Sequence, residues 1–132
     1  MHVTGSSVLL DSTIVIHHFR RNDEVTKKLF SSGPLFLPSV VVGELYHGAY
    51  KSNQPEKNLE LLANFLLLTT VLPVDVATSN YYGQIKAALA KAGNLIPEND
   101  IWIAALAREY QLPIATRDKH FELVPGITVL YW

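Results

Sequence analysis

The sequence contains no cysteine among its 132 residues. This absence excludes disulfide cross-links, zinc sites built from thiolates and catalysis by a cysteine nucleophile. It is also typical of proteins that work in a reducing compartment, so we expect a cytoplasmic protein.

The sequence also has little charge. Charged residues make up 17% and hydrophobic residues 48%, with a mean hydropathy of +0.15. The net charge is -1, from 11 Lys and Arg against 12 Asp and Glu, so the chain lacks the overall positive field of duplex-binding proteins. This composition excludes intrinsic disorder and indicates more apolar surface than a solitary monomer hides, so we expect self-association or a protein partner.

Long hydrophobic runs are absent as well. No segment approaches the roughly 20 apolar residues that cross a bilayer, and residues 1–7 lack the basic and apolar parts of a secretory signal. We therefore expect a soluble protein that does not bind membranes. The length fits one domain over residues 1–132.

Short apolar runs alternate with helical segments along the chain. Strands are predicted at residues 7–11, 35–37, 71–74, 113–116 and 127–132. Helices are predicted at residues 14–20, 23–31, 39–51, 56–68, from the cap Asp75 to about 91, and 98–110, with a short helical turn at 119–123. This alternation is typical of an α/β fold with a mainly parallel sheet covered by helices on both faces.

Four acids lie in apolar surroundings, where a negative charge has no obvious structural use. Asp11 and Asp118 follow predicted strands, at the sheet edge where parallel α/β proteins bind ligands. Glu44 and Asp100 lie early in predicted helices, on their apolar faces. Taken singly, each acid has an ordinary explanation as a helix cap, a turn residue or one half of an ion pair.

Taken together, the four acids predict a metal site. Crowded carboxylates repel one another unless a cation neutralises them, and oxygen ligands suit Mg²⁺ or Mn²⁺. Such an ion can activate water and bind a phosphoryl oxygen, so hydrolysis of phosphodiesters is the leading reaction. The histidines show no HExxH spacing, and surface or core packing accounts for His17, His18, His47 and His120.

Other phosphate chemistry fits the sequence less well. A phosphatase that forms an aspartyl-phosphate needs an acid at position 13, where Thr13 stands, and neither a GxxxxGK(S/T) loop nor a GxGxxG fingerprint occurs. Basic side chains close to the predicted site could hold substrate phosphates, with solvated surface charge as the alternative. They are Arg117 and Lys119 beside Asp118, and Arg20 and Arg21 after the first helix.

Four segments resemble one family. The segments are LLDSTIVI around Asp11, SVVVGELYHGA around Glu44, PENDIWIAALA around Asp100 and IATRDKHFELVPGITVL around Asp118. In order, spacing and total length they resemble the PIN-domain ribonucleases, specifically the VapC-type toxins of toxin-antitoxin pairs. The resemblance covers essentially the whole chain.

The resemblance implies a three-layer α/β/α sandwich with a five-stranded parallel sheet. It also implies an endoribonuclease that uses Mg²⁺ or Mn²⁺ to cut single-stranded or loop RNA. Asp11, Asp100 and Asp118 would bind the metal directly, Glu44 would do so directly or through water, and Thr116 would orient a carboxylate or water. The implied partners are a small antitoxin, whose tail blocks the site, and a second copy of the chain.

One position departs from the family pattern, which has Asn or Ser two residues after the first Asp. Thr13 stands there, and we expect it to support the site through its hydroxyl. The alternative function is a PIN-like module that has lost catalysis and serves in RNA binding or assembly. A receiver-like phosphoacceptor is set aside, because Asp11 stands alone after the first strand.

Overall fold

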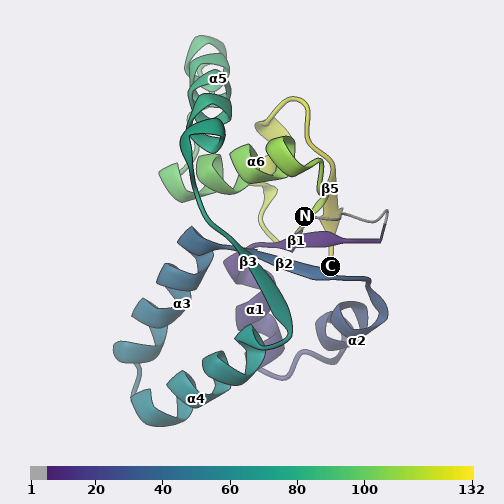
Figure 1. Cartoon of the computed structure of the whole chain (residues 1–132), viewed down its shortest axis with the longest axis vertical. Helices are drawn as coiled ribbons and strands as arrows, with labels where there is room; N and C mark the ends of the chain where they lie inside the picture. Colours follow the sequence, from purple (N-terminus) through teal and green to yellow (C-terminus); the bar gives the residue numbers. More distant parts are fainter. Residues whose placement is uncertain (1–5) are drawn as a thin grey trace.

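Five parallel strands form one sheet in the computed structural model, which describes residues 6–132 (Figure 1). Their order is β3-β2-β1-β4-β5. The strands are β1 (Val8–Leu10), β2 (Leu35–Pro38), β3 (Thr69–Leu72), β4 (Ile114–Thr116) and β5 (Val129–Tyr131). The predicted five-stranded parallel sheet is confirmed.

Helices cover both faces of the sheet (Figure 1). The helices are α1 (Ser12–Phe19), α2 (Asp23–Ser31), α3 (Ser39–Tyr50), α4 (Pro55–Leu66), α5 (Val76–Ala92), α6 (Glu98–Tyr110) and the 3-10 helix η1 (Lys119–Leu123). Helices α1 to α4 lie on one face, while α5 and α6 lie on the other. This arrangement follows from right-handed crossovers that run in opposite directions from β1 and β3, and it confirms the predicted α/β/α sandwich.

The boundaries agree with the predicted ones to within a residue or two, with the largest differences at α1, β3 and β5. Helix α1 begins at Ser12, two residues before the predicted helix at 14–20, because Asp11 is its N-cap. Strand β3 begins two residues before the predicted strand at 71–74, because α4 ends at Leu66, where Thr69 Oγ1 donates to the Leu66 carbonyl (3.1 Å). Pro73 then ends the strand, since proline has no N–H for the sheet ladder. Strand β5 is shorter than the predicted run at 127–132.

The core lies in the central strands and the helices packed against them. Every side chain of β1 and β4 is buried, because both faces of these strands are covered. Helix α6 contributes the longest buried stripe, from Ile101 to Ala107 with one partly buried interruption at Trp102. Phe121 of η1 is also fully buried and anchors the loop after β4.

The strand order places a topological switch point at the carboxyl ends of β1 and β4. From β1, the chain builds the sheet outward to β2 and β3, and it then crosses back to add β4 on the other side of β1. Ligands of open α/β sheets bind at such a switch point, beyond the carboxyl ends of the strands. Asp11 follows β1 directly and Asp118 lies two residues after β4.

None of the helices between residues 6 and 132 combines the length and apolar character needed to cross a membrane. The expectation that residues 1–7 form no secretory signal falls mainly on residues 1–5, which lie outside the described residues.

Candidate metal site

Asp11 is the most deeply placed of the four acids. Its exposed fraction is 3%, and it is the N-cap of α1, where Oδ1 accepts the Ile14 N–H at 3.2 Å. The capping role considered from the sequence is therefore real. Capping uses only part of the carboxylate's bonding capacity, so the same side chain can also face a ligand.

Two threonine hydroxyls bind the Asp11 carboxylate, one at each oxygen. Thr13 Oγ1 donates to Oδ1 at 2.6 Å, and Thr116 Oγ1 donates to Oδ2. Each hydroxyl also accepts a backbone N–H from the loop after β4: Arg117 N reaches Thr13 Oγ1 at 3.0 Å and Asp118 N reaches Thr116 Oγ1 at 2.8 Å. Because each hydroxyl has one hydrogen, accepting from the loop directs that hydrogen to Asp11.

Asp100 and Asp118 lie together, and His120 lies between them. His120 Nδ1 is 3.1 Å from Asp100 Oδ2 and 3.1 Å from Asp118 Oδ1. One potential ligand atom from each of the three residues lies within 4.8 Å of the other two. The sequence interpretation that packing alone accounts for His120 is therefore wrong. The signal was its position two residues after Asp118, where the N-capped turn of η1 brings it back to the acid.

Glu44 lies on α3, and its hydrogen bonds are weaker than those of the other three acids. Ser12 Oγ donates to Glu44 Oε2 at 3.5 Å, at the limit of a hydrogen bond, and the Asn99 side chain also donates to it. Asp100 and Asp11 are close enough to raise its pKa. Neither Ser12 nor Asn99 stood out in the sequence, since small polar residues early in helices are common caps.

The acids affect one another's protonation. The pKa values of Asp11, Glu44 and Asp100 are all raised, and burial is the largest cause for each of them. Charge repulsion adds to it: Asp100 acts on Asp11 and Glu44, and Asp118 acts on Asp100. Hydrogen bonds from Thr116, Thr13 and Ile14 partly offset the effect at Asp11. Burial and mutual repulsion thus both disfavour ionisation of these acids, and a cation bound among them would offset that effect.

This repulsion predicts a pH-dependent stability of the metal-free protein. Glu44 has a raised pKa in the folded state, so its contribution to stability is full below the unfolded pKa and is lost as pH rises through the folded pKa. We expect the free energy of unfolding of Glu44→Gln to equal that of the wild type near pH 4. Near pH 7.5 we expect it to be higher, by less than about 1 kcal/mol because solvent screens the repulsion. Urea denaturation in EDTA at both pH values measures the difference, and a pH-independent difference would contradict the repulsion.

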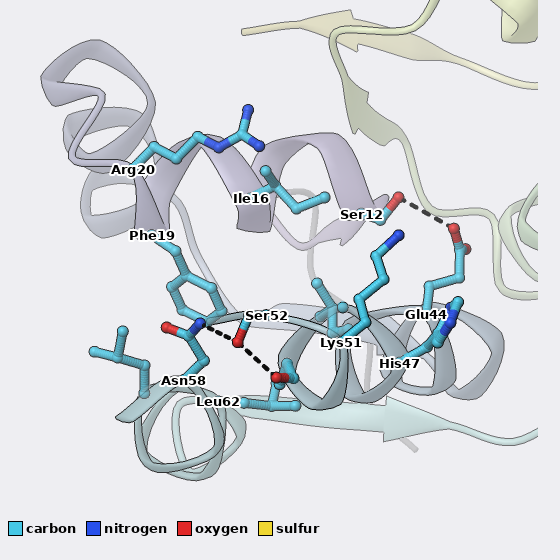
Figure 2. Close-up of a pocket in the computed structure, with 14 residues that line it drawn as sticks. Ser12, Ile16, Phe19, Arg20, Glu44, His47, Lys51, Ser52, Asn58 and Leu62 are labelled. Atoms are coloured by element: carbon cyan, nitrogen blue, oxygen red, sulfur yellow. Dashed lines mark hydrogen bonds between the residues drawn. The ribbon is translucent and has the colours of Figure 1, made fainter. Parts of the chain in front are cut away.

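A cavity of about 570 Å³ opens beside Glu44, between α1, α3 and α4 (Figure 2). Its walls include the apolar side chains Ile16, Phe19 and Leu62. Figure 2 shows Ser12 and Glu44 at one end, bridged by their hydrogen bond. Glu44 is thus the one of the four acids that lines this cavity.

The four basic residues proposed for substrate phosphates are exposed, and they differ in surroundings. Arg20 lines the cavity beside Glu44. Arg117 is tied to the end of β5, because its Nη1 donates to the Trp132 carbonyl at 2.5 Å. Arg21 has a left-handed backbone (φ 62°) and lines a separate hollow with Phe65. Lys119 begins η1. Their binding to phosphates stays a prediction.

Glu109, an acid outside the candidate site, has a structural contact. Glu109 accepts a hydrogen bond from the buried Thr78 hydroxyl at 2.6 Å, and Thr78 also completes the capping box of α5 with Asp75. Glu109 thus fastens α6 to the start of α5, so its role is structural.

The side chains of Asp100, Asp118 and His120 offer ligand atoms that fit a small divalent cation. This set of ligand atoms consists mainly of carboxylate oxygens, with one imidazole nitrogen, and it lacks thiolates. Hard oxygen donors suit Mg²⁺ and Mn²⁺, whereas structural zinc sites use Cys and His. The pKa values of Asp11, Glu44 and Asp100 are all raised, and perturbed pKa values are typical of functional sites.

Comparisons with known proteins identify the family of this chain. The PIN domain family matches residues 8–127. Ribonuclease VapC2 of Haemophilus influenzae is 37% identical over 127 residues, which cover 94% of this chain and 96% of the relative. The tRNA(fMet)-specific endonuclease VapC of Shigella flexneri is 34% identical over 127 residues, with the same coverage.

Solved structures show the same fold. The DNA-bound VapBC complex from Salmonella typhimurium has a chain that superposes with a TM-score of 0.88 and 28% identity, covering 96% of this chain and 98% of that one. VapBC2 from Rickettsia felis, bound to a DNA fragment from its promoter, gives a TM-score of 0.90 at 24% identity, covering the same shares. The chain belongs to the PIN-domain family, and within it to the VapC ribonucleases.

Proposed function

We propose that this protein is a metal-dependent endoribonuclease that hydrolyses phosphodiester bonds of single-stranded or loop RNA, and that it acts as the toxin of a toxin-antitoxin pair. One observation carries the proposal. Acids from four distant parts of the sequence, Asp11, Glu44, Asp100 and Asp118, gather at the switch point of the sheet. Relatives that match nearly the whole chain are named ribonucleases.

We assign the cation to Asp11, Asp100 and Asp118, with Glu44 bound directly or through water. When bound, Mg²⁺ or Mn²⁺ supplies an acidified water as nucleophile and neutralises a phosphate oxygen. The protein's own part is to hold the carboxylates in place. Thr13 and Thr116 serve this purpose, because their hydroxyls fix both oxygens of Asp11 against the loop that carries Asp118.

The substrate phosphates need positive charge near this acidic group. Arg20 is a candidate, because it caps the C-terminus of α1 and lines the same cavity as Glu44, at the opposite end from it (Figure 2). Lys119 is directly next to Asp118, one of the proposed metal ligands, and begins η1. We propose that these two cations contact the RNA backbone, while Arg117 and Arg21 contribute less because of their other contacts.

Transfer RNA is the substrate to test first, since two relatives at 34% and 31% identity are named tRNA(fMet)-specific endonucleases. We expect the purified protein with Mg²⁺ or Mn²⁺ to cut initiator tRNA in a loop, and EDTA to stop the reaction. Sequencing of the new RNA ends locates the cut. Cuts that persist in EDTA, or equal degradation of every RNA at every position, would contradict the proposal.

The antitoxin and the homodimer are also proposals. Relatives in solved structures are VapBC complexes, and this chain exposes large apolar side chains that a partner would cover. The most exposed are Phe30, Tyr50, Leu67, Val76 and Leu95. Co-purification with the product of a neighbouring small reading frame, followed by measurement of the complex mass, tests both partners.

A non-catalytic PIN-like module remains the second candidate function. It predicts that the four acids no longer bind a cation and that the protein acts only in RNA binding or assembly. The retained hydrogen bonds around Asp11 favour the enzyme, because a module without catalysis has no need to hold that carboxylate at both oxygens. Calorimetric titration with Mn²⁺ separates the two, since only the enzyme binds the ion.

A further inference from the structure

His120 is held beside Asp100 and Asp118 by the fold of η1. Asp118 caps this short helix by accepting the His120 N–H at 2.9 Å. The next residue, Phe121, is buried in the core and packs the turn against the domain. The position of the imidazole is therefore set by a backbone cap and a core anchor.

The distances match those between neighbouring ligands of one ion. His120 Nδ1 lies 3.1 Å from a carboxylate oxygen of Asp100 and 3.1 Å from one of Asp118. In an octahedral site with ligands 2.0–2.1 Å from the ion, neighbouring ligand atoms lie about 2.9 Å apart. The same three atoms can thus face a cation with only small adjustments.

Resting on the proposed function, we infer that His120 Nδ1 is a ligand of the active-site ion, together with Asp100 and Asp118, and that this nitrogen makes the site select Mn²⁺ over Mg²⁺. Mg²⁺ takes oxygen ligands almost exclusively, whereas imidazole is a good ligand of first-row transition ions. An oxygen site with one imidazole therefore favours Mn²⁺ more than a site of carboxylates alone. His120 is half exposed, so it can turn toward an ion without disturbing the core.

A second reading of the same contacts is a positioning role. In that case Nδ1 keeps a proton and donates it to the carboxylates, and the ion meets only oxygen. The two roles differ in one property. A ligand nitrogen is coupled magnetically to bound Mn²⁺, whereas a protonated nitrogen that donates to the carboxylates is not bound to it.

Pulsed electron paramagnetic resonance of the Mn²⁺-loaded protein tests the inference. We expect a nitrogen-14 coupling in the wild type that is lost in His120→Asn and kept in His47→Asn. His47 is the matched control, because it is the exposed histidine one helical turn after Glu44. Circular dichroism checks that both variants fold. Labelling the wild type with nitrogen-15 histidine repeats the test without a substitution, because it changes the coupling if a histidine binds the ion.

The selectivity is measured by competition between Mn²⁺ and Mg²⁺. In the wild type we expect a lower dissociation constant for Mn²⁺ than for Mg²⁺. In His120→Asn we expect the preference for Mn²⁺, the Mg²⁺ dissociation constant divided by that of Mn²⁺, to fall roughly tenfold. Bound Mn²⁺ without nitrogen coupling, coupling that survives in His120→Asn, or an unchanged ratio would overturn the inference. In those cases RNA cleavage by the wild type would leave the proposed function standing. Failure of the wild type to bind Mn²⁺ would remove the inference, and failure to bind either Mn²⁺ or Mg²⁺ would remove both.

Discussion

Asp100→Asn is expected to lower RNA cleavage at least about 1000-fold, which corresponds to roughly 4 kcal/mol of the activation barrier. The substitution keeps the shape of the side chain and its ability to accept a hydrogen bond from His120. It removes the negative charge of the carboxylate, which we propose binds the cation. The initial rate of cleavage of an end-labelled RNA by purified protein measures the loss.

The same variant is expected to be more stable than the wild type when metal is absent. Burial and the Asp118 charge raise the pKa of Asp100, so its ionised form destabilises the folded protein at neutral pH. We expect a melting temperature up to about 4 °C higher in EDTA. Loss of activity together with loss of folding would point to a structural role and contradict the account.

Glu98→Gln is the matched control for Asp100→Asn. Glu98 lies two residues earlier in the first turn of α6, and it is exposed and paired with Lys86 at 2.5 Å. Its neutralisation removes one charge from the same turn and leaves the acidic group intact. We expect cleavage within about twofold of the wild type, since exposed ion pairs contribute little to stability. A large loss in Glu98→Gln would show that net charge, and not the metal site, sets the rate.

Thr116→Val is the second substitution with a large expected effect. Valine has nearly the same shape, but it removes the donor to Asp11 Oδ2 and the acceptor for the Asp118 N–H. Both groups lie at the centre of the proposed site. We expect cleavage to fall about 10- to 100-fold, as for other residues that orient metal ligands, and stability to fall by about 1–3 kcal/mol.

Thr116→Ser separates the hydroxyl from the methyl group. Serine keeps both hydrogen bonds and loses only the methyl group, so we expect activity close to the wild type with a small loss of stability. Mn²⁺ affinity, measured by calorimetry, should follow the same order of wild type, Ser and Val. Equal affinity in Thr116→Val and the wild type would show that the hydroxyl does not orient a ligand.

The sequence predicts the fold well because its local signals agree with one another. The buried strands β1 and β4 appear as short apolar runs, and caps or prolines mark most helix ends. The strand order needs more than these signals and was not predicted, because the resemblance to a known family implied only the number of strands and their parallel arrangement. Strand β3 was misplaced because α4 ends by a threonine hydrogen bond to a carbonyl, which the apolar pattern does not reveal.

The candidate site divides in the same way. Asp11 and Asp118 could be placed from the strand ends they follow, since parallel strands bring their carboxyl ends to one edge. His120 and the paired hydroxyls of Thr13 and Thr116 could not be placed from spacing alone. Their contacts join residues about a hundred positions apart, or depend on one turn of 3-10 helix, and only the tertiary structure defines them.

The central claim is that one cation, held by Asp11, Asp100 and Asp118 with Glu44, carries out RNA hydrolysis. A titration of metal-free protein with Mn²⁺, in which bound ion and cleavage rate are measured in the same samples, tests it most directly. The account predicts that cleavage rises in proportion to the ion bound, and that Asp100→Asn shows neither tight binding nor cleavage. Cleavage without bound ion, or undiminished cleavage by Asp100→Asn, would contradict it.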